Sequence, residues 1–511
     1  MLRVAAIILL VTSGAVFEAA RVQSLLSASS SDLWGHLRVG AWILQSHSVP
    51  HSGVFSRSPE RSWNDASWGF DALLAFAFRG LGMRSIPALQ MGCNAALALV
   101  TFLLAGGLRG KFWRAVALST IAQFILGGTP LGPGFISILL FAVELFLVME
   151  FRSTGKVPQG NVRLLLGLPV LFLLWANLDE QFVVGIALLI LYLAADGLER
   201  LAAGTGVHEG QGPSRSFGTM IAIMGLCVIA ALINPNFYHP FRLFFSDITS
   251  SANRYLPGFQ AMTFKQPQDY LLLLLTMGAF LALGNRRSRD LFQILLLIGC
   301  TLLSFHSQRD AWMATLGAIA ILGEGARRED EDMGSTRTFE RWSPAMAAAL
   351  ISMAILVAAI WRLPGDNALT AKVAEHYPVA ASDYIRSHQL AQPLFNAYEW
   401  GGFLMWYLPE YPVAIDSRSG LYDDDSIVRY AKVMNAELPY TTDPQFMQAR
   451  TLLLPRDSLM GEALRGNPSF KVAYEDRVAI VLVREAWRDS AADISRADNG
   501  TRDPEILGST P

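Results

Sequence analysis

Two side chains suited to acid–base chemistry stand four residues apart in the stretch SDLWGHLRVG, which runs from residue 31 to residue 40. On a helix, Asp32 and His36 would share one face. A carboxylate and an imidazole on one face can act on a single substrate hydroxyl or hold a single metal ion. A structural role is also open, because Asp32 suits the N-cap of a helix that starts at Leu33, and capping does not exclude catalysis.

The rest of the chain is strongly apolar. Of its 511 residues, 52% are hydrophobic and 16% are charged, and the mean hydropathy is +0.34. A soluble enzyme carries about a quarter charged residues, so the composition indicates a membrane protein with some soluble mass attached. The net charge of −2 and the lack of a basic run give no support to a nucleic-acid partner. Cys93, Cys227 and Cys300 each lie in an apolar stretch and are typical of small buried hydrophobes, not of a disulfide or metal site.

Apolar stretches typical of membrane-crossing helices recur as far as residue 361. Several are shorter than the usual ~20 residues, so neighbouring pairs are easily miscounted. We expect a polytopic α-helical membrane domain over residues 1–361 with about eleven spans. The predicted spans are 4–20, 86–108, 112–128, 131–151, 162–177, 182–198, 217–233, 269–284, 290–304, 311–323 and 343–361.

The charges of the connecting loops predict the topology. If the N-terminus is cytoplasmic, the loops on that side carry most of the loop lysines and arginines, as in FRSTGKVPQGNVR and GNRRSR. The short opposite loops GGTPLGPG and WANLDEQ carry none, which follows the positive-inside rule. The first loop, about residues 21–85, is an exception, but it is long enough for the rule to weaken. An odd number of spans then places residues 362–511 outside the cytoplasm.

The first apolar segment has a second interpretation. MLR ahead of a short apolar run, followed by the small residues of FEAA, is typical of a cleaved signal peptide. A retained helix suits a polytopic chain better, and we expect it.

After residue 361 the pattern changes to a small α/β domain over residues 362–487. The short runs PVAIDS, TLLLPRD, KVAYED and VAIVLVRE predict strands, and ASDYIRSHQL and DSLMGEALRG predict helices between them. The last stretch, residues 488–511, is polar and poor in aromatic residues, which is typical of disorder.

The first loop is rich in tryptophan and polar side chains. A helix from about Trp68 to Arg79 follows, with Asp71 and Arg79 on an otherwise apolar surface. The tryptophans have a purely structural interpretation as anchors at the membrane interface. Glu144 lies inside a predicted span, where an acid is either functional or hydrogen-bonded within the bundle.

A series of motifs carries a resemblance to a known family. SDLWGHLRVGAWILQSHSVPHSGVFS, SWNDASW, LLWANLDEQFVVG, INPNFYHPFRLF and FNAYEWGGFLMWYLPEYPVAIDSRSGLYDDD occur in this order between Asp32 and Arg484. In these motifs the chain resembles bacterial polytopic proteins classed with the GT-C glycosyltransferases, and it is similar in plan to protein mannosyltransferases and arabinosyltransferases. The motif with YEWGGFLMW and IDSRSGLY is the most specific part of the match.

The resemblance implies an enzyme of the bacterial inner membrane that moves a sugar from a polyprenyl-phosphate donor to a glycan, lipid or protein acceptor outside the cytoplasm. It implies that Asp32 is the base, with His36 orienting a substrate or a metal. No cofactor is certain, and a divalent metal stays open. Arginines on the outer side, Arg38 among them, are candidates to hold the donor phosphate. The further candidates for substrate contact are Trp34, Asp65, Asp179, Glu180, His239, Arg242, His306, Arg309, Glu399 and Trp400.

The chain also departs from the family pattern. Gly35 replaces a second tryptophan, Ala66 and Ser67 replace a histidine and a glutamate, and Asp179 and Glu180 stand where the family has His-Gly. These losses leave a second hypothesis open, a catalytically inactive relative that binds a lipid-linked glycan or a partner protein. A third hypothesis is a transporter, against which the spans show few ionisable residues and no repeat. The enzyme hypothesis predicts that Asp32, His36, Asp179, Arg242 and Arg309 line one outward cavity.

Overall fold

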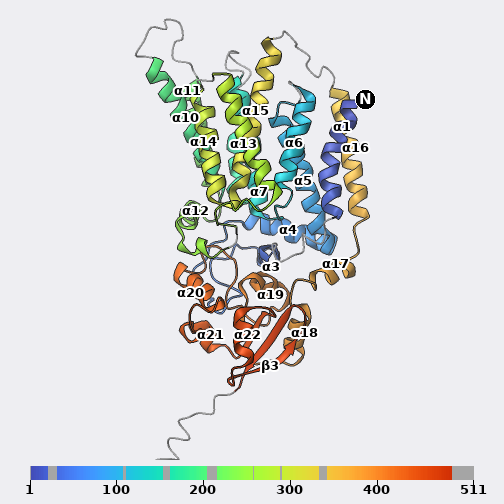
Figure 1. The fold of residues 1–511 in the computed structure, drawn as a ribbon, viewed down its shortest axis with the longest axis vertical. Helices are drawn as coiled ribbons and strands as arrows, with labels where there is room; N and C mark the ends of the chain where they lie inside the picture. The colour runs from blue at the N-terminus through green and yellow to red at the C-terminus, as the bar shows by residue number, and fades with distance from the viewer. Residues whose placement is uncertain are drawn as a thin grey trace, which may run out of the picture.

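The fold was analysed in a computed structural model, which describes residues 2–20, 31–107, 111–153, 162–203, 216–256, 258–287, 290–332 and 342–485. A tall bundle of helices forms one half of the molecule, and a small α/β domain forms the other (Figure 1). The beginning of α1 and the α/β domain lie at opposite ends of the bundle (Figure 1). The predicted disordered tail, residues 488–511, lies outside the described residues.

Each of the eleven predicted spans contains a helix of the bundle. A short helix, α8 (Val162–Leu165), precedes α9 in the fifth of them. The bundle helices are α1 (Leu2–Ala20), α5 (Ser85–Leu104), α6 (Phe112–Leu126), α7 (Pro133–Ser153), α9 (Gly167–Trp175), α10 (Phe182–Ala203), α11 (Ser216–Ala231), α13 (Pro267–Asn285), α14 (Leu291–His306), α15 (Ala311–Asp332) and α16 (Trp342–Trp361).

By length and composition, fewer of these helices qualify as membrane spans. Four stretches of the described chain are long and apolar enough to cross a membrane, and a fifth is added if the bent pair Ala347–Trp361 and Asp366–Val373 counts as one span. Shorter apolar helices, such as Phe112–Leu126 and Leu291–His306, fall below that length. The number of eleven crossings therefore stays a prediction.

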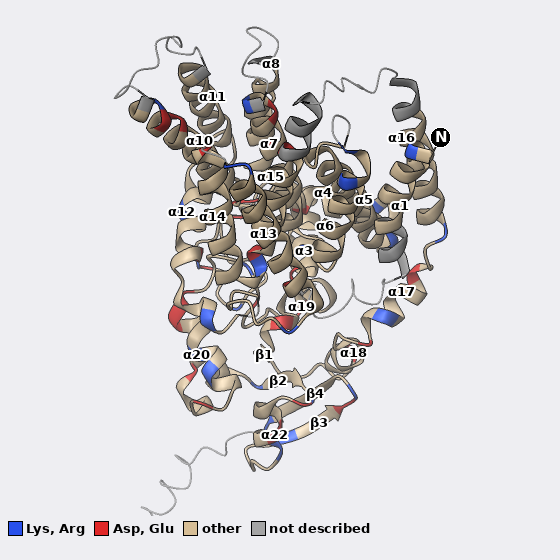
Figure 2. Ribbon diagram, turned by 45° about the horizontal axis from the view of Figure 1, so that its top comes forward, with Lys and Arg blue, Asp and Glu red and all other residues tan. Residues whose placement is uncertain are grey.

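The bundle is held by apolar packing along its length and by ion pairs at its end. Charged residues are sparse along the helices (Figure 2). They gather at the end of the bundle away from the α/β domain and in the α/β domain itself. At the end of α7, Arg152 lies 2.8 Å from a carboxylate oxygen of Asp290 and 3.2 Å from one of Glu199. These pairs tie α7 to the start of α14 and the end of α10.

Two helices of the first loop lie between the bundle and the α/β domain (Figure 1). They are α3 (Ser31–Ser46) and α4 (Trp68–Leu81), and α4 confirms the helix predicted from Trp68 to Arg79. A single turn, η2 (Gly82–Arg84), joins α4 to α5. The expected N-cap is wrong, because α3 begins at Ser31 and Asp32 lies inside its first turn. The two helices pack closely because Gly40 has no side chain where it meets the backbone of Asp71.

The α/β domain contains a four-stranded sheet of order β1-β2-β4-β3. β1 (Leu394–Asn396) runs parallel to β2 (Thr451–Pro455), whereas β4 (Ala479–Arg484) is antiparallel to both β2 and β3 (Phe470–Glu475). β2, β3 and β4 coincide with three of the predicted runs.

The fourth predicted strand, PVAIDS, is wrong. Its backbone bonds leave the sheet, since Val413 donates to Phe55 O at 3.1 Å and accepts from Arg57 N at 2.9 Å. Ala414 N bonds the side chain of Asn396 at 2.8 Å. The segment therefore connects the domain to the first loop, and the short β1, which was not predicted, completes the sheet.

The helices of the domain pack on both faces of the sheet and on α3. α18 and α22 confirm the two predicted helices, and one core joins Leu33 and Leu37 of α3 to Phe403 and Val481 of the domain. Outside the domain, α12 (His239–Thr249) and the turns η3 (Ser251–Arg254) and η4 (Gln308–Asp310) lie at the same end of the bundle. The domain elements are α17 (Asp366–Val373), α18 (Val379–Ser387), η5 (Tyr398–Trp400), α19 (Gly401–Tyr407), α20 (Asp424–Met434), η6 (Tyr440–Thr442), α21 (Pro444–Gln448) and α22 (Leu459–Arg465).

Candidate functional site

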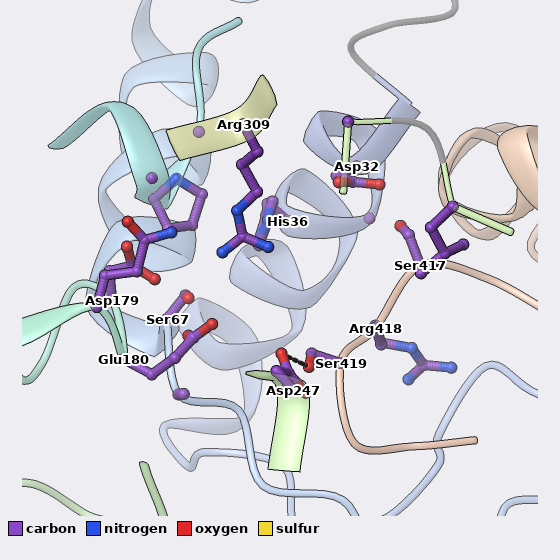
Figure 3. A pocket seen from close by; sticks show the side chains of 18 of the residues that line it. Asp32, His36, Ser67, Asp179, Glu180, Asp247, Arg309, Ser417, Arg418 and Ser419 are labelled. Atoms are coloured by element: carbon purple, nitrogen blue, oxygen red, sulfur yellow. Dashed lines mark hydrogen bonds between the residues drawn. The ribbon is translucent and has the colours of Figure 1, made fainter. Parts of the chain in front are cut away.

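A cavity of about 870 Å³ lies where the bundle, the first loop and the α/β domain meet. Six of the residues predicted to act in catalysis or substrate contact line it, and Figure 3 shows five of them, Asp32, His36, Asp179, Glu180 and Arg309. Four of the five residues predicted to share one cavity are among them, and Arg242 is not. The six are Asp32, His36, Asp65, Asp179, Glu180 and Arg309.

His36 pairs with an acid of the neighbouring helix. Its Nδ1 lies 2.7 Å from Oδ1 of Asp71, whose side chain is 1% exposed, whereas that of His36 is 24% exposed. The edge of the imidazole meets the ring of Phe70, with 5.5 Å between centroids. Burial lowers the pKa of His36, but the charge and hydrogen bond of Asp71, helped by Asp32 and Asp65, outweigh this and raise it to about 9.

Asp65 is a buried acid on the loop that leads into α4. One carboxylate oxygen accepts a hydrogen bond from Ser67 N at 3.0 Å, and the other has no hydrogen-bond partner among the described residues. Burial, and then the charge of Asp71, raise the pKa of Asp65 well above its usual range. Ala66 and Ser67, at the positions where the family pattern has histidine and glutamate, line the same cavity.

Asp179 and Glu180 lie in the turn between α9 and α10. Ser137 of α7 donates to Oδ2 of Asp179 at 2.5 Å, and Trp175 Nε1 in turn donates to Ser137 Oγ at 2.6 Å. Burial raises the pKa of both acids, and the charge of Asp179 adds to the rise at Glu180. Arg309 lowers both, to a smaller extent.

Arg309 supplies a cation from η4. Its backbone N–H donates to Gly258 O at 2.9 Å, and its guanidinium carbon lies 4.7 Å from the ring centroid of Phe259. The guanidinium extends into the cavity (Figure 3). The guanidinium of Arg309 favours an anionic ligand group. This preference is local, because the other walls of the cavity carry carboxyl groups.

The α/β domain contributes a wall that the sequence reasoning missed. Asp416, Arg418 and Ser419 line the cavity, and Ser419 Oγ donates to a carboxylate oxygen of Asp247 at 2.5 Å (Figure 3). Burial raises the pKa of Asp247 to about 6. The motif IDSRSG was a signal for Asp416 and Arg418, and the lone acid on an apolar helix was a signal for Asp71.

The other predicted residues lie outside the cavity. Trp34 is 1% exposed and stacks on Trp406 at 4.6 Å, and Trp400 is also buried. His239 bonds Asn236 O and stacks on Tyr238. The remaining residues outside the cavity are Arg38, Arg242, His306 and Glu399.

A second, smaller pocket of about 100 Å³ adjoins the site. It shares Leu131 with the large cavity, and it includes Phe70, the residue that touches His36. Its lining side chains are Phe70, Leu73, Leu74, Leu89, Cys93, Leu131, Ile136 and Leu178. A pocket with this lining suits a hydrocarbon and no charged group.

Four further residues were singled out in the sequence, three cysteines and Glu144. Cys93, Cys227 and Cys300 are free cysteines, so none forms a disulfide. Glu144 is fully buried and has no hydrogen-bond partner among the described residues, so it is not part of the cavity or of a hydrogen-bonded network.

The described side chains of the cavity are not arranged as a metal site. Within the described ranges, no group of three or more histidine, cysteine, aspartate or glutamate side chains is arranged to hold a metal ion. Four acids of the cavity instead bond to protein groups: Asp71 to His36, Asp179 to Ser137, Asp247 to Ser419 and Asp416 to Arg418. We therefore derive no step through a metal.

No protein-family model matches the chain, and neither does any curated protein. Solved structures do. The archaeal oligosaccharyltransferase AglB from Archaeoglobus fulgidus, in complex with an inhibitory peptide and a dolichol-phosphate, matches with a TM-score of 0.51 at 10% identity over 87% of this chain and 69% of that one. An oligosaccharyltransferase of the same organism, tethered with an acceptor peptide, matches with a TM-score of 0.50 at 10% identity, over 88% of this chain and 69% of that one.

A more remote match is ArnT from Cupriavidus metallidurans bound to undecaprenyl phosphate. Its TM-score is 0.43 at 13% identity, over 93% of this chain and 98% of that one. At identities this low, a likeness to a solved structure concerns the fold and not the function. The chain therefore shares its overall fold with the archaeal oligosaccharyltransferase AglB.

Proposed function

We propose that this protein is a membrane glycosyltransferase that moves a sugar from a polyprenyl-phosphate donor to an acceptor outside the cytoplasm. One observation carries the proposal: a cavity with both acids and a cation opens at the end of an apolar bundle, beside a wholly apolar pocket. A donor of this class has a charged phosphate and sugar at one end and a hydrocarbon tail at the other. The large polar cavity suits the phosphate and the sugar, and the small apolar pocket suits the hydrocarbon tail.

Asp32 is the base in this mechanism. Its carboxylate takes the proton of an acceptor hydroxyl, and the oxygen attacks the anomeric carbon of the sugar. The bond between that carbon and the phosphate oxygen breaks, and its electron pair leaves with the polyprenyl phosphate. The position of Asp32 supports this role, because it is exposed at the start of α3 and lines the cavity.

Arg309 holds the donor phosphate. A guanidinium binds phosphate through two parallel N–H groups, and the charge also stabilises the phosphate as it leaves. Asp65, Asp179 and Glu180 line the rest of the cavity and contact the sugar or the acceptor. The solved AglB structure was obtained with a dolichol-phosphate, which supports a lipid phosphate as the ligand class here.

The proposal includes an orientation. The N-terminus is cytoplasmic, the protein lies in the bacterial inner membrane, and the domain of residues 362–487 is extracytoplasmic. In support, α1 begins at the end of the bundle that is opposite to the cavity (Figure 1). The loop charges support an extracytoplasmic cavity in this orientation.

The test is transfer of labelled sugar from polyprenyl-phosphate donors by purified protein. Asp32→Asn keeps the shape of the side chain and removes the base, so we expect transfer to fall at least about a hundredfold. Asp457→Asn, in the turn after β2 and outside the cavity, is the matched control and keeps full activity. Transfer by Asp32→Asn at the wild-type rate overturns the mechanism.

A second function is favoured by Ala66 and Ser67, which place a methyl group and a hydroxyl in the cavity wall. A relative with these residues binds a lipid-linked glycan or a partner without transferring the sugar. The same assay separates the two functions. Donor binding by wild type without transfer from any donor supports the binding protein.

A further inference from the structure

We propose that Asp71 is a positioning residue that fixes the His36 imidazole as a cationic hydrogen-bond donor to the phosphate of the lipid-linked substrate. The inference rests on the proposed function. It adds His36 to Arg309 as a second side chain that binds the donor phosphate. It assigns a role to Asp71, a buried acid that the mechanism above does not use. It also gives His36 a role other than that of a base.

The geometry fixes which nitrogen faces the cavity. Asp71 Oδ1 lies 2.7 Å from Nδ1 of His36, so the proton on Nδ1 is held by Asp71. The other ring nitrogen, Nε2, is left for the cavity that His36 lines. Phe70 limits rotation of the ring through its edge contact at 5.5 Å. These two contacts together hold the imidazole in one orientation.

The charges around the ring favour the imidazolium. Asp71 faces it from α4, Asp32 from its own helix and Asp65 from the preceding loop. Asp179 acts on it from the turn after α9. Removing the 1%-exposed carboxylate of Asp71 from water is costly unless a cation compensates it, so the pair keeps its proton.

The placement of the cation suits a lipid phosphate. His36 and Arg309 both extend into the cavity from different elements (Figure 3). Phe70, in contact with His36, also lines the small apolar pocket. The phosphate of an isoprenoid chain that lies in the small pocket would therefore meet His36 first.

The probe is farnesyl phosphate, a short isoprenoid phosphate, and binding to detergent-solubilised protein is measured between about pH 7.5 and about pH 10. Its phosphate has a second pKa of about 6, so the charge of the ligand is constant over this range. The variants are Asp71→Asn, His36→Gln and the double variant. Asp457→Asn is the matched acid-to-amide control, and farnesol tests the apolar contribution alone.

Glu180, whose pKa is about 8, also titrates in this range, so wild type is compared with His36→Gln at each pH. Above about pH 9, where His36 loses its charge, wild type should lose about tenfold more affinity than that variant. Both single variants should bind about tenfold more weakly than wild type at about pH 7.5, and they should keep only the shallower pH dependence that Glu180 causes. The double variant should match His36→Gln, because Asp71 acts through His36. A structural role for Asp71 gives additive losses instead.

Wild-type pH dependence in His36→Gln or Asp71→Asn overturns the inference, as does an additive double variant. His36→Gln retains a donor for Asp71 and keeps the test valid where Asp71→Asn does not fold. Binding needs no sugar transfer, so the two proposals fail separately. A wild type that shows the expected profile but transfers no sugar from any donor refutes the glycosyltransferase alone.

Discussion

Arg418 donates two hydrogen bonds to the carboxylate of Asp416, at 2.9 Å from Nε to Oδ1 and at 2.8 Å from Nη2 to Oδ2. The two side chains are 7% and 0% exposed. The guanidinium also donates to Val54 O at 2.7 Å and lies 4.9 Å from the ring centroid of Trp63. One buried cation therefore joins the α/β domain to the first loop at the cavity wall.

Arg418→Met should destabilise the protein by about 3–5 kcal/mol, because Asp416 is then left buried without a counter-ion. The measurement is the free energy of unfolding in detergent. Arg418→Met combined with Asp416→Leu should recover most of the loss, since no charge stays buried. Arg465→Gln, which breaks an exposed pair with Glu475, is the control and should have little effect. Equal stability of wild type and Arg418→Met would show that water reaches Asp416.

Gly35 stands where the family that the sequence resembles has a second tryptophan, and its neighbours leave room for a small side chain only. A Cβ at Gly35 would lie 3.4 Å from Met405 Cε and 3.6 Å from Gly402 Cα. Gly35→Ala therefore fits and should be neutral or stabilising by up to about 1 kcal/mol, because alanine favours helix. Gly35→Trp, which restores the family residue, should destabilise by about 1–3 kcal/mol through overpacking against α19. Unfolding of both variants tests this, and a stable Gly35→Trp contradicts the packing.

Hydropathy and charge allowed the helices and part of the cavity to be predicted. Long apolar runs mark the bundle. Acids or arginines at the helix ends that face the α/β domain, such as Asp179 and Arg309, meet in the cavity because those ends lie together. The partner of His36 was not predictable in this way. Asp71 is 35 residues away, and the contact depends on how closely α3 and α4 pack.

The two tryptophans predicted to contact substrate, Trp34 and Trp400, are buried instead, for a physical reason. A tryptophan in a polar motif serves a sugar site or a core equally well, and pattern alone does not distinguish these roles. Trp34 has Trp406, Tyr377 and Phe403 around it, all from a domain more than 300 residues later in the sequence. Its burial depends on a long-range contact that the local sequence does not contain.

Ser137→Ala should change both stability and pH dependence. It leaves Trp175 Nε1 and a carboxylate oxygen of Asp179 without this shared partner, at a cost of about 1–3 kcal/mol. The hydrogen bond from Ser137 lowers the pKa of Asp179, so its loss raises that pKa further. If transfer needs ionised Asp179, the acidic limb of the rate profile moves to higher pH.

The control for Ser137→Ala is Ser119→Ala, which also removes a buried hydroxyl, bonded to Thr101 and to Ala98 O, but lies outside the cavity. It should destabilise the protein and leave the pH profile of sugar transfer unchanged. An identical profile for wild type and Ser137→Ala would mean that Asp179 is not needed in its ionised form.

Cys93→Phe should fill the small apolar pocket and weaken binding of the isoprenoid tail. The pocket is only about 100 Å³, so an added ring leaves little room for a hydrocarbon chain. Farnesyl phosphate should bind about tenfold more weakly, whereas inorganic phosphate should bind as it does to wild type. Cys93→Ala keeps the pocket open and is the control. Unchanged farnesyl phosphate binding in Cys93→Phe would place the tail elsewhere.

The pair of His36 and Asp71 also predicts how stability changes with pH. The pKa of His36 is about 9 in the fold against 6.5 for the free side chain, so the fold gains stability from the proton. This contribution, about 3 kcal/mol, is fully present below about pH 6.5 and is lost as the pH rises through about 9. Wild type should therefore exceed His36→Gln in thermal unfolding midpoint at about pH 6, and the difference should vanish near pH 10. A difference of the same size at both pH values would mean that the imidazole contributes through packing and not through its charge.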